Sequence, residues 1–186
     1  MRYLLLGLLS ALLAGGCREE PRGAASAPTS QPASWRVCFS PRGDCTRLII
    51  ETIAAARAGI LVQAYSLTSR PIAQALIDAH QRGVSVAVLL DTSQRTERQA
   101  LAAVLAEAAI PVFIDAAHRI AHNKVMVIDD DTVITGSFNF TRSAEEANAE
   151  NLLVIHDRAL AQRYRDNWDL HRRHAAPYRA VRSTPS

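Results

Sequence analysis

Helical and strand patterns alternate along the middle of this 186-residue chain. Segments with apolar residues at helical spacing are separated by short apolar runs that are typical of buried strands. Helices are predicted at 46–58, 71–83 and 93–108, and strands at 60–66, 84–91 and 111–115. Strands joined through helices usually pair in parallel, with the helices on the faces of the sheet, so this alternation predicts an α/β fold.

The pattern changes after residue 115. Two apolar runs, 123–129 and 132–137, flank three consecutive aspartates and predict a β-hairpin. A further strand is predicted at 150–157, followed by a long closing helix at 159–174. We therefore expect a mixed, largely parallel sheet that is sandwiched between helices.

The two ends of the chain differ from its middle. Residues 1–17 combine a basic start, a short apolar run and small residues, which predicts a signal peptide. The stretch before Cys17 resembles a bacterial lipobox, so cleavage would leave Cys17 as a lipidated N-terminus; plain export and a buried N-terminal helix are the alternatives. Residues 18–34 read as a flexible linker, 35–176 as the folded domain and 177–186 as a C-terminal tail. We expect an exported bacterial protein, either periplasmic or anchored to a membrane by lipid.

The other two cysteines, Cys38 and Cys45, are seven residues apart. In an exported protein this spacing favours a disulfide, with two free or buried thiols as the alternative. We found no second Cys/His pair at ligand spacing, so the sequence predicts no metal site.

The chain is weakly basic, and one of its basic residues differs in type from all the others. Among 21 Lys and Arg residues, Lys124 is the single lysine. Arginine and alanine are both abundant, which suggests a coding bias and makes the arginine excess weak support for any function. Removing residues 1–17 takes away Arg2 and leaves 20 basic and 18 acidic residues, a formal charge of +2. This charge does not identify a nucleic-acid partner.

Polar residues recur at fixed spacing through the predicted hairpin. Segment 122–141 reads HNKVMVIDDDTVITGSFNFT and contains the pattern His122-x-Lys124-x4-Asp129-x6-Gly136-Ser137-x-Asn139. His122 and Lys124 alternate on one strand, so their side chains leave the same face. Ser137 and Asn139 share a face just after the next strand. Pairing of the two strands would gather an imidazole, an ammonium, a hydroxyl and a carboxamide, a set that suits a phosphodiester.

One carboxylate is predicted to support this group. Glu150 begins the third strand, where it would accept a hydrogen bond from one ring nitrogen of His122. Such a bond fixes the tautomer and makes the other nitrogen more nucleophilic. The remaining histidines match no position of the pattern; we interpret His171 and His174, together with Arg172 and Arg173, as a solvated helix end.

The pattern resembles the signature of the phospholipase D superfamily, and the resemblance extends over about residues 35–175. It implies a phospholipase D/nuclease-like fold and a phosphodiesterase with His122, Lys124, Ser137, Asn139 and Glu150 in its catalytic site. Asp129 and Gly136 would support the motif without touching phosphate. No carboxylate cluster suggests a two-metal site and the motif supplies no metal ligand set, so we expect activity in excess chelator, without a metal or cofactor.

The resembled chemistry needs two histidines, one to attack phosphorus and one to protonate the leaving oxygen. This chain carries one copy of the motif, so the resemblance implies a homodimer with its active site on the two-fold axis. Short single-motif members are small exported endonucleases, so we expect a nucleic-acid substrate. Hydrolysis of phospholipid head groups is the alternative, and a catalytically silent phosphate-binding lipoprotein is the third possibility. Four arginines that flank the motif are candidates for contacting a nucleic-acid backbone: Arg95, Arg98, Arg119 and Arg142.

Overall fold

The computed structural model describes residues 34–97 and 100–179. These residues fall within one compact unit, 32–186. The predicted signal peptide, Cys17, most of the linker and Arg98 lie outside the described residues. No helix in the described ranges is both long and apolar enough to cross a membrane.

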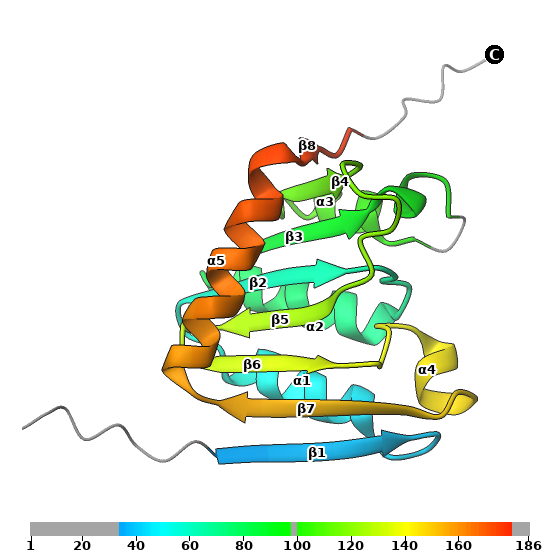
Figure 1. The fold of residues 1–186 in the computed structure, drawn as a ribbon, viewed down its shortest axis with the longest axis vertical. Helices are drawn as coiled ribbons and strands as arrows, with labels where there is room; N and C mark the ends of the chain where they lie inside the picture. The colour runs from blue at the N-terminus through cyan, green and yellow to red at the C-terminus, as the bar shows by residue number, and fades with distance from the viewer. Residues whose placement is uncertain (1–33, 98–99, 180–186) are drawn as a thin grey trace, which may run out of the picture. The chain divides into compact units, whose positions relative to one another are not determined.

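Eight strands form one sheet in the order β1-β7-β6-β5-β2-β3-β4-β8 (Figure 1). Their bounds are β1 Ser34–Ser40, β2 Gly59–Ala64, β3 Ser85–Asp91, β4 Val112–Asp115, β5 Lys124–Ile128, β6 Thr132–Gly136, β7 Glu150–His156 and β8 Ala176–Pro177. Parallel pairing is confined to β2–β3 and β3–β4. The other five pairings are antiparallel. The mixed sheet is confirmed, but the expectation that it is largely parallel is wrong, because β5, β6 and β7 are joined by a hairpin and a short connection instead of crossover helices.

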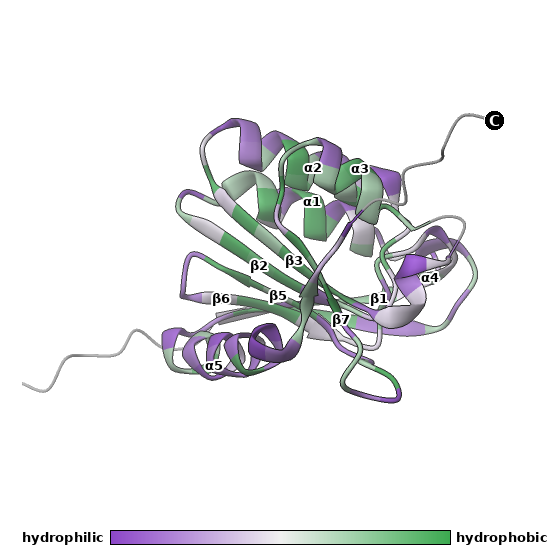
Figure 2. Ribbon diagram, turned by 90° about the horizontal axis from the view of Figure 1, so that it is seen from above, coloured by the Kyte–Doolittle hydropathy of each residue, from purple (hydrophilic) through white to green (hydrophobic). Residues whose placement is uncertain are grey.

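Helices cover both faces of the sheet (Figure 2). On one face lie α1 (Cys45–Ala55), α2 (Arg70–Gln81) and α3 (Ala102–Glu107), and on the other lies the long α5 (Arg158–His174). The short α4 (Arg142–Glu146) follows β6. Because the central strands are covered on both sides, they are continuously apolar instead of alternating, and all five residues of β5 are buried. The predicted α/β sandwich is confirmed.

The main core lies between the sheet and the α1–α3 layer, and two smaller apolar clusters lie under α5. Trp168 of α5 is buried, and its Nε1 donates a hydrogen bond to the backbone oxygen of Val62 in β2 at 2.9 Å. This bond satisfies the indole N–H while its ring packs on the sheet. The last two turns of α5 are thereby held against the middle of the sheet.

The helix expected at 93–108 is wrong in its first half. The chain there forms a 3₁₀ turn, Thr92–Arg95, and α3 begins only at Ala102. The side chain of Gln94 is buried and accepts a hydrogen bond from the Leu67 backbone N–H at 3.1 Å. A continuous helix would carry Gln94 away from that buried donor, so tertiary contact overrides the helical pattern.

The edge strand β1 was not predicted. Its residues pair along β7 from Ser34 opposite His156 to Ser40 opposite Glu150. A disulfide between Cys38 of β1 and Cys45 at the start of α1 is present, with the two Cα atoms 5.7 Å apart. The pairing expected from the spacing of these cysteines thus links the edge of the sheet to the first helix.

Candidate active site

The hairpin that carries the motif is closed by two aspartates. Asp129 and Asp130 have left-handed φ values of 51° and 60° and form the centre of a turn that the Asp131 N–H closes by donating to the Ile128 oxygen at 3.3 Å. The Asp129 carboxylate accepts hydrogen bonds from the backbone N–H groups of Arg57, Ala58 and Gly59 at 2.8, 2.7 and 3.0 Å. Burial acts to raise the pKa of Asp129, but these bonds outweigh it and the pKa is lowered. The motif aspartate therefore fastens the hairpin to the start of β2.

His122 and Lys124 lie at the opposite end of β5 from Asp129. The Lys124 ammonium donates a hydrogen bond to the backbone oxygen of His122 at 2.9 Å. The Tyr65 ring stands edge-on to the His122 ring, with centroids 4.7 Å apart, and its centroid is 5.2 Å from Nζ of Lys124. The backbone N–H of Tyr65 also donates to the oxygen of Asn123 at 2.7 Å. Tyr65 thus touches both predicted catalytic side chains, and sequence reasoning did not single it out.

Lys124 is 7% exposed, whereas His122 is exposed. Burial lowers the pKa of Lys124, and the negative charge of Glu150 acts in the opposite direction. An ammonium has three N–H donors. Within the described residues it makes one hydrogen bond, to the backbone of His122. The remaining donors and the buried charge suit an anionic ligand.

The segment after β6 is shaped by Gly136. Its φ is 149°, and a Cβ at this position would lie 2.3 Å from the backbone oxygen of Asn151. The next residue, Ser137, accepts hydrogen bonds at its Oγ from the backbone N–H of Asn151 at 3.1 Å and from its Nδ2 at 3.3 Å. Only glycine permits this close approach of the β6 end to β7. This close approach positions Ser137 against β7, where its Oγ bonds to Asn151.

Asn139 lies between two fully buried phenylalanines, Phe138 and Phe140. Its Oδ1 atom is buried without a hydrogen-bond partner among the described residues. Leaving a buried polar atom unpaired costs about 1–3 kcal/mol. An amide oxygen accepts hydrogen bonds, so only an N–H or O–H donor would satisfy this atom, and a phosphate oxygen would bind the Nδ2 group of Asn139 instead.

Glu150 takes a partner other than the one expected. Its Oε1 accepts a hydrogen bond from Nδ2 of Asn148 at 3.2 Å. No hydrogen bond joins Glu150 to His122 among the described residues, so the expectation of an orienting bond within one chain is wrong. The β7 strand nevertheless places Glu150 near enough to Lys124 for its charge to raise the lysine pKa. Within one chain, Glu150 therefore acts on the pKa of the Lys124 ammonium and not on His122.

The three flanking arginines within the described residues lie on the surface. Arg95, Arg119 and Arg142 are exposed, and Arg142 forms an ion pair with Glu146. Arg95 also lines a pocket that includes Tyr178 and Arg179. These guanidinium groups are accessible to a polyanion.

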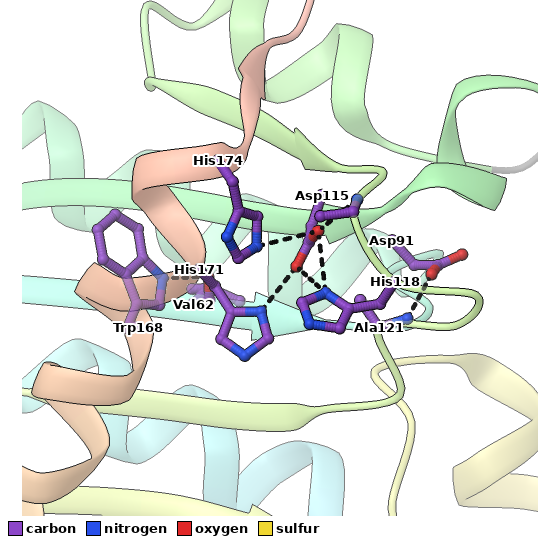
Figure 3. A network of polar contacts seen from close by, with 9 residues as sticks. Val62, Asp91, Asp115, His118, Ala121, Trp168, His171 and His174 are labelled. Atoms are coloured by element: carbon purple, nitrogen blue, oxygen red, sulfur yellow. Dashed lines mark hydrogen bonds and ion pairs between the residues drawn. The ribbon is translucent and has the colours of Figure 1, made fainter.

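A second polar cluster lies at the end of α5 (Figure 3). His118, His171 and His174 surround the carboxylate of Asp115, which has no exposed side-chain surface. Burial acts to raise the pKa of Asp115, but hydrogen bonds from His171, the Ala117 N–H, His118 and His174 together lower it to about 2. The interpretation of His171 as part of a solvated helix end is wrong, because its side chain is 14% exposed and meets Asp115. The sequence contains a pattern that could have predicted this cluster: two pairs at i,i+3 spacing, Asp115/His118 and His171/His174.

The fold and the motif geometry define a class of protein, and comparison with known proteins agrees with it. Residues 49–171 match the family model described as "Cardiolipin synthase, PLD-like domain". The chain belongs to the phospholipase D superfamily.

Among curated relatives, a protein named phospholipase D from Rickettsia prowazekii is 47% identical over 131 residues, which cover 70% of this chain and 64% of that protein. The mitochondrial cardiolipin hydrolase of Canis lupus familiaris is 32% identical over 132 residues, or 70% of this chain and 52% of the relative. The chain thus matches about two thirds or less of the length of these proteins.

Among solved structures, the phospholipase D family member Nuc from Salmonella typhimurium is 37% identical, with a TM-score of 0.76. The match covers 80% of this chain and 99% of Nuc. NucT from Helicobacter pylori, at 23% identity and a TM-score of 0.73, shares the fold.

Proposed function

We propose that this protein is a phosphodiesterase that cleaves nucleic acid, and that it does so without a metal ion. The observation that carries the proposal is the pairing of an exposed His122 with a buried Lys124 ammonium that has donors to spare. An imidazole is a nucleophile, and a preorganised cation beside it stabilises negative charge that develops on phosphate oxygens. Similarity to Nuc over nearly the whole of that chain supports the endonuclease assignment.

The reaction proceeds by two displacements. A ring nitrogen of His122 attacks phosphorus, a P–N bond forms, and the P–O bond to the leaving group breaks. A second His122, from another copy of the chain, gives its proton to the leaving oxygen. That second imidazole then takes a proton from water, whose oxygen attacks the phosphohistidine and releases the phosphate monoester. Lys124 and Asn139 hold the phosphate oxygens through both steps.

The second histidine makes the homodimer part of the proposal. One motif per chain supplies one nucleophile, so a two-fold axis next to His122 would complete the site. The exposed Ile120, two residues away, offers an apolar contact for such an interface. Mixing the parent chain with increasing amounts of a His122→Ala chain, under conditions that allow subunits to exchange, tests this arrangement. If each site needs two His122 side chains, mixed dimers are inactive and activity falls as the square of the parent fraction, whereas a fall in simple proportion to the parent fraction contradicts a shared site.

Hydrolysis of phospholipid head groups is the second candidate, because relatives 47% identical carry the name phospholipase D. The discriminating experiment incubates the purified protein in excess EDTA with supercoiled plasmid, RNA and phosphatidylcholine vesicles. Nicking of plasmid that weakens steeply as salt rises supports the nuclease. Choline release without nicking supports the phospholipase. Loss of every activity in EDTA, restored by a divalent ion, would contradict the metal-independent mechanism.

A further inference from the structure

We propose that Asp115, His118, His171 and His174 form a binding site for one divalent transition-metal ion of the zinc class. The four residues come from three parts of the fold. Asp115 ends β4, His118 lies three residues later in the loop toward β5, and the other two histidines occupy the last turn of α5. Figure 3 shows the three imidazoles converging on one carboxylate.

The spacing of the donor atoms suits a single ion. One ligand atom from each residue can be chosen so that all four lie within 4.8 Å of one another. Nδ1 of His171 is 2.7 Å from the Asp115 carboxylate, Nδ1 of His118 is 3.2 Å from it, and Nε2 of His174 is 3.3 Å from it. Tetrahedral zinc with bonds of about 2.0–2.2 Å places its ligand atoms roughly 3.3 Å apart. Small side-chain rotations would therefore convert the cluster into a coordination shell.

The chemistry of the four donor atoms limits which metal ion the site can bind. Three imidazoles and one carboxylate are ligands that zinc and its neighbours in the first transition row accept. Magnesium and calcium prefer oxygen ligands and are disfavoured by three nitrogens. Neutral imidazoles with one carboxylate leave the complex with a single positive charge when zinc is bound.

The surroundings hold the ligands in place. The Asp115 carboxylate also accepts a hydrogen bond from the Ala117 N–H at 3.0 Å. The loop that carries His118 is fixed by Asp91, whose Oδ2 accepts a bond from the Ala121 N–H at 2.7 Å. Trp168, one turn before His171, is anchored to Val62. Orientation of ligands by such outer contacts is a common property of metal sites.

The alternative is a cluster held by hydrogen bonds alone. A single carboxylate would then share its two oxygens among three imidazoles whose ring centroids lie 4.7–5.4 Å apart. One metal ion, by contrast, would satisfy one nitrogen of each imidazole and the carboxylate together. An ion here would tie the end of α5 to the loop that leads into His122. Its effect would be on stability, because none of the four residues takes part in the proposed displacement.

The experiment uses the full protein without a polyhistidine tag, stripped with chelator and then titrated with ZnCl₂, CoCl₂ or MgCl₂. We expect about one zinc per chain by calorimetry and elemental analysis, an intense visible Co²⁺ spectrum typical of tetrahedral coordination, and no binding of Mg²⁺. Zinc should raise the unfolding temperature. His171→Ala should weaken zinc binding by at least about 100-fold, beyond the 10–100-fold loss common for outer-shell changes.

Two controls keep the result interpretable. His156→Ala removes an exposed histidine that contacts Thr132 instead of Asp115, and it should bind zinc like the parent. His174→Ala removes a ligand that is only partly buried, so this variant should fold and can replace His171→Ala if that variant does not. Absence of zinc binding, or equal binding by the parent and by both cluster variants, would overturn the proposal and leave a hydrogen-bonded cluster only. Activity of the cluster variants in EDTA separates this outcome from failure of the catalytic proposal, which concerns His122.

Discussion

The ammonium of Lys124 is held 2.9 Å from the backbone oxygen of His122, the residue whose side chain lies exposed beside it. His122 lies two residues before Lys124, the first residue of β5, so this contact joins the cation to the backbone of the nucleophile candidate without an intervening element. The Tyr65 ring covers both.

Lys124→Arg keeps the positive charge but should lower kcat by about 10²–10³, as loss of one preorganised charge-stabilising donor does. The position is 7% exposed, and a planar guanidinium does not fit the space of a compact ammonium. Nicking rates in EDTA measure the loss of activity, and far-ultraviolet circular dichroism checks that the variant stays folded. A variant that is folded and fully active would show that charge alone is enough.

His122→Ala should abolish turnover while the unfolding temperature stays close to that of the parent, because the side chain is exposed and its loss leaves no cavity. Reactions with labelled substrate that are quenched with detergent at alkaline pH, where the P–N bond survives, should trap label on the parent and none on the variant. His156→Ala is the matched control and should keep full activity. Label retained by His122→Ala would move the nucleophile elsewhere.

Tyr65→Phe should keep most activity, whereas Tyr65→Ala should lose roughly tenfold, in line with about 0.5–2 kcal/mol for a ring facing a cation. The ring contacts both His122 and Lys124, and phenylalanine preserves those contacts. Steady-state kinetics of the two variants, side by side, give the comparison. Equal losses in both would assign the effect to the hydroxyl instead of the ring.

Gly136→Ala should be strongly destabilising, by about 2–4 kcal/mol, because its Cβ would meet the Asn151 oxygen at 2.3 Å. Gly83→Ala is the matched control: its φ is also positive, at 91°, but nothing lies within 4 Å of the added Cβ. That variant should cost only about 1–2 kcal/mol, the backbone strain alone. Urea unfolding measures both, and equal losses would remove the steric account of Gly136.

Asp129→Asn should change the acid limb of the stability curve. The pKa of Asp129 is lowered in the folded protein, so its contribution is fully present above the ordinary value of 3.8 and is lost as pH falls through the lower folded value. The variant lacks that contribution and should be less stable at pH 7 but differ less from the parent at pH 2–3. Asp169→Asn, on the exposed side of α5, serves as the control. A difference in the free energy of unfolding that stays constant across pH would show that the charge of Asp129 does not contribute to stability.

Local pattern predicted the hairpin well because its causes are local. Two apolar runs around a pair of aspartates specify β5, its turn and β6, and the period of two fixes which residues share a face. The partner of Gln94 could not be predicted in the same way. It is a backbone group from a distant segment, and a buried donor such as the Leu67 N–H takes whichever acceptor the fold brings to it.

The sequence by itself determined the α/β class, the mixed sheet, the motif positions on the hairpin and the family to which the chain belongs. Apolar periodicity and fixed spacing are properties of short stretches, and they survive without knowledge of the rest of the chain. Only the tertiary structure decided that parallel pairing stops at β4, that Tyr65 covers His122 and Lys124, and that four residues from 115 to 174 meet around one carboxylate. Those contacts join segments far apart in sequence. Tyr65 reaches His122 and Lys124 because β2 pairs with β5, and the cluster forms because α5 packs across a sheet whose strand order is not the order of the chain.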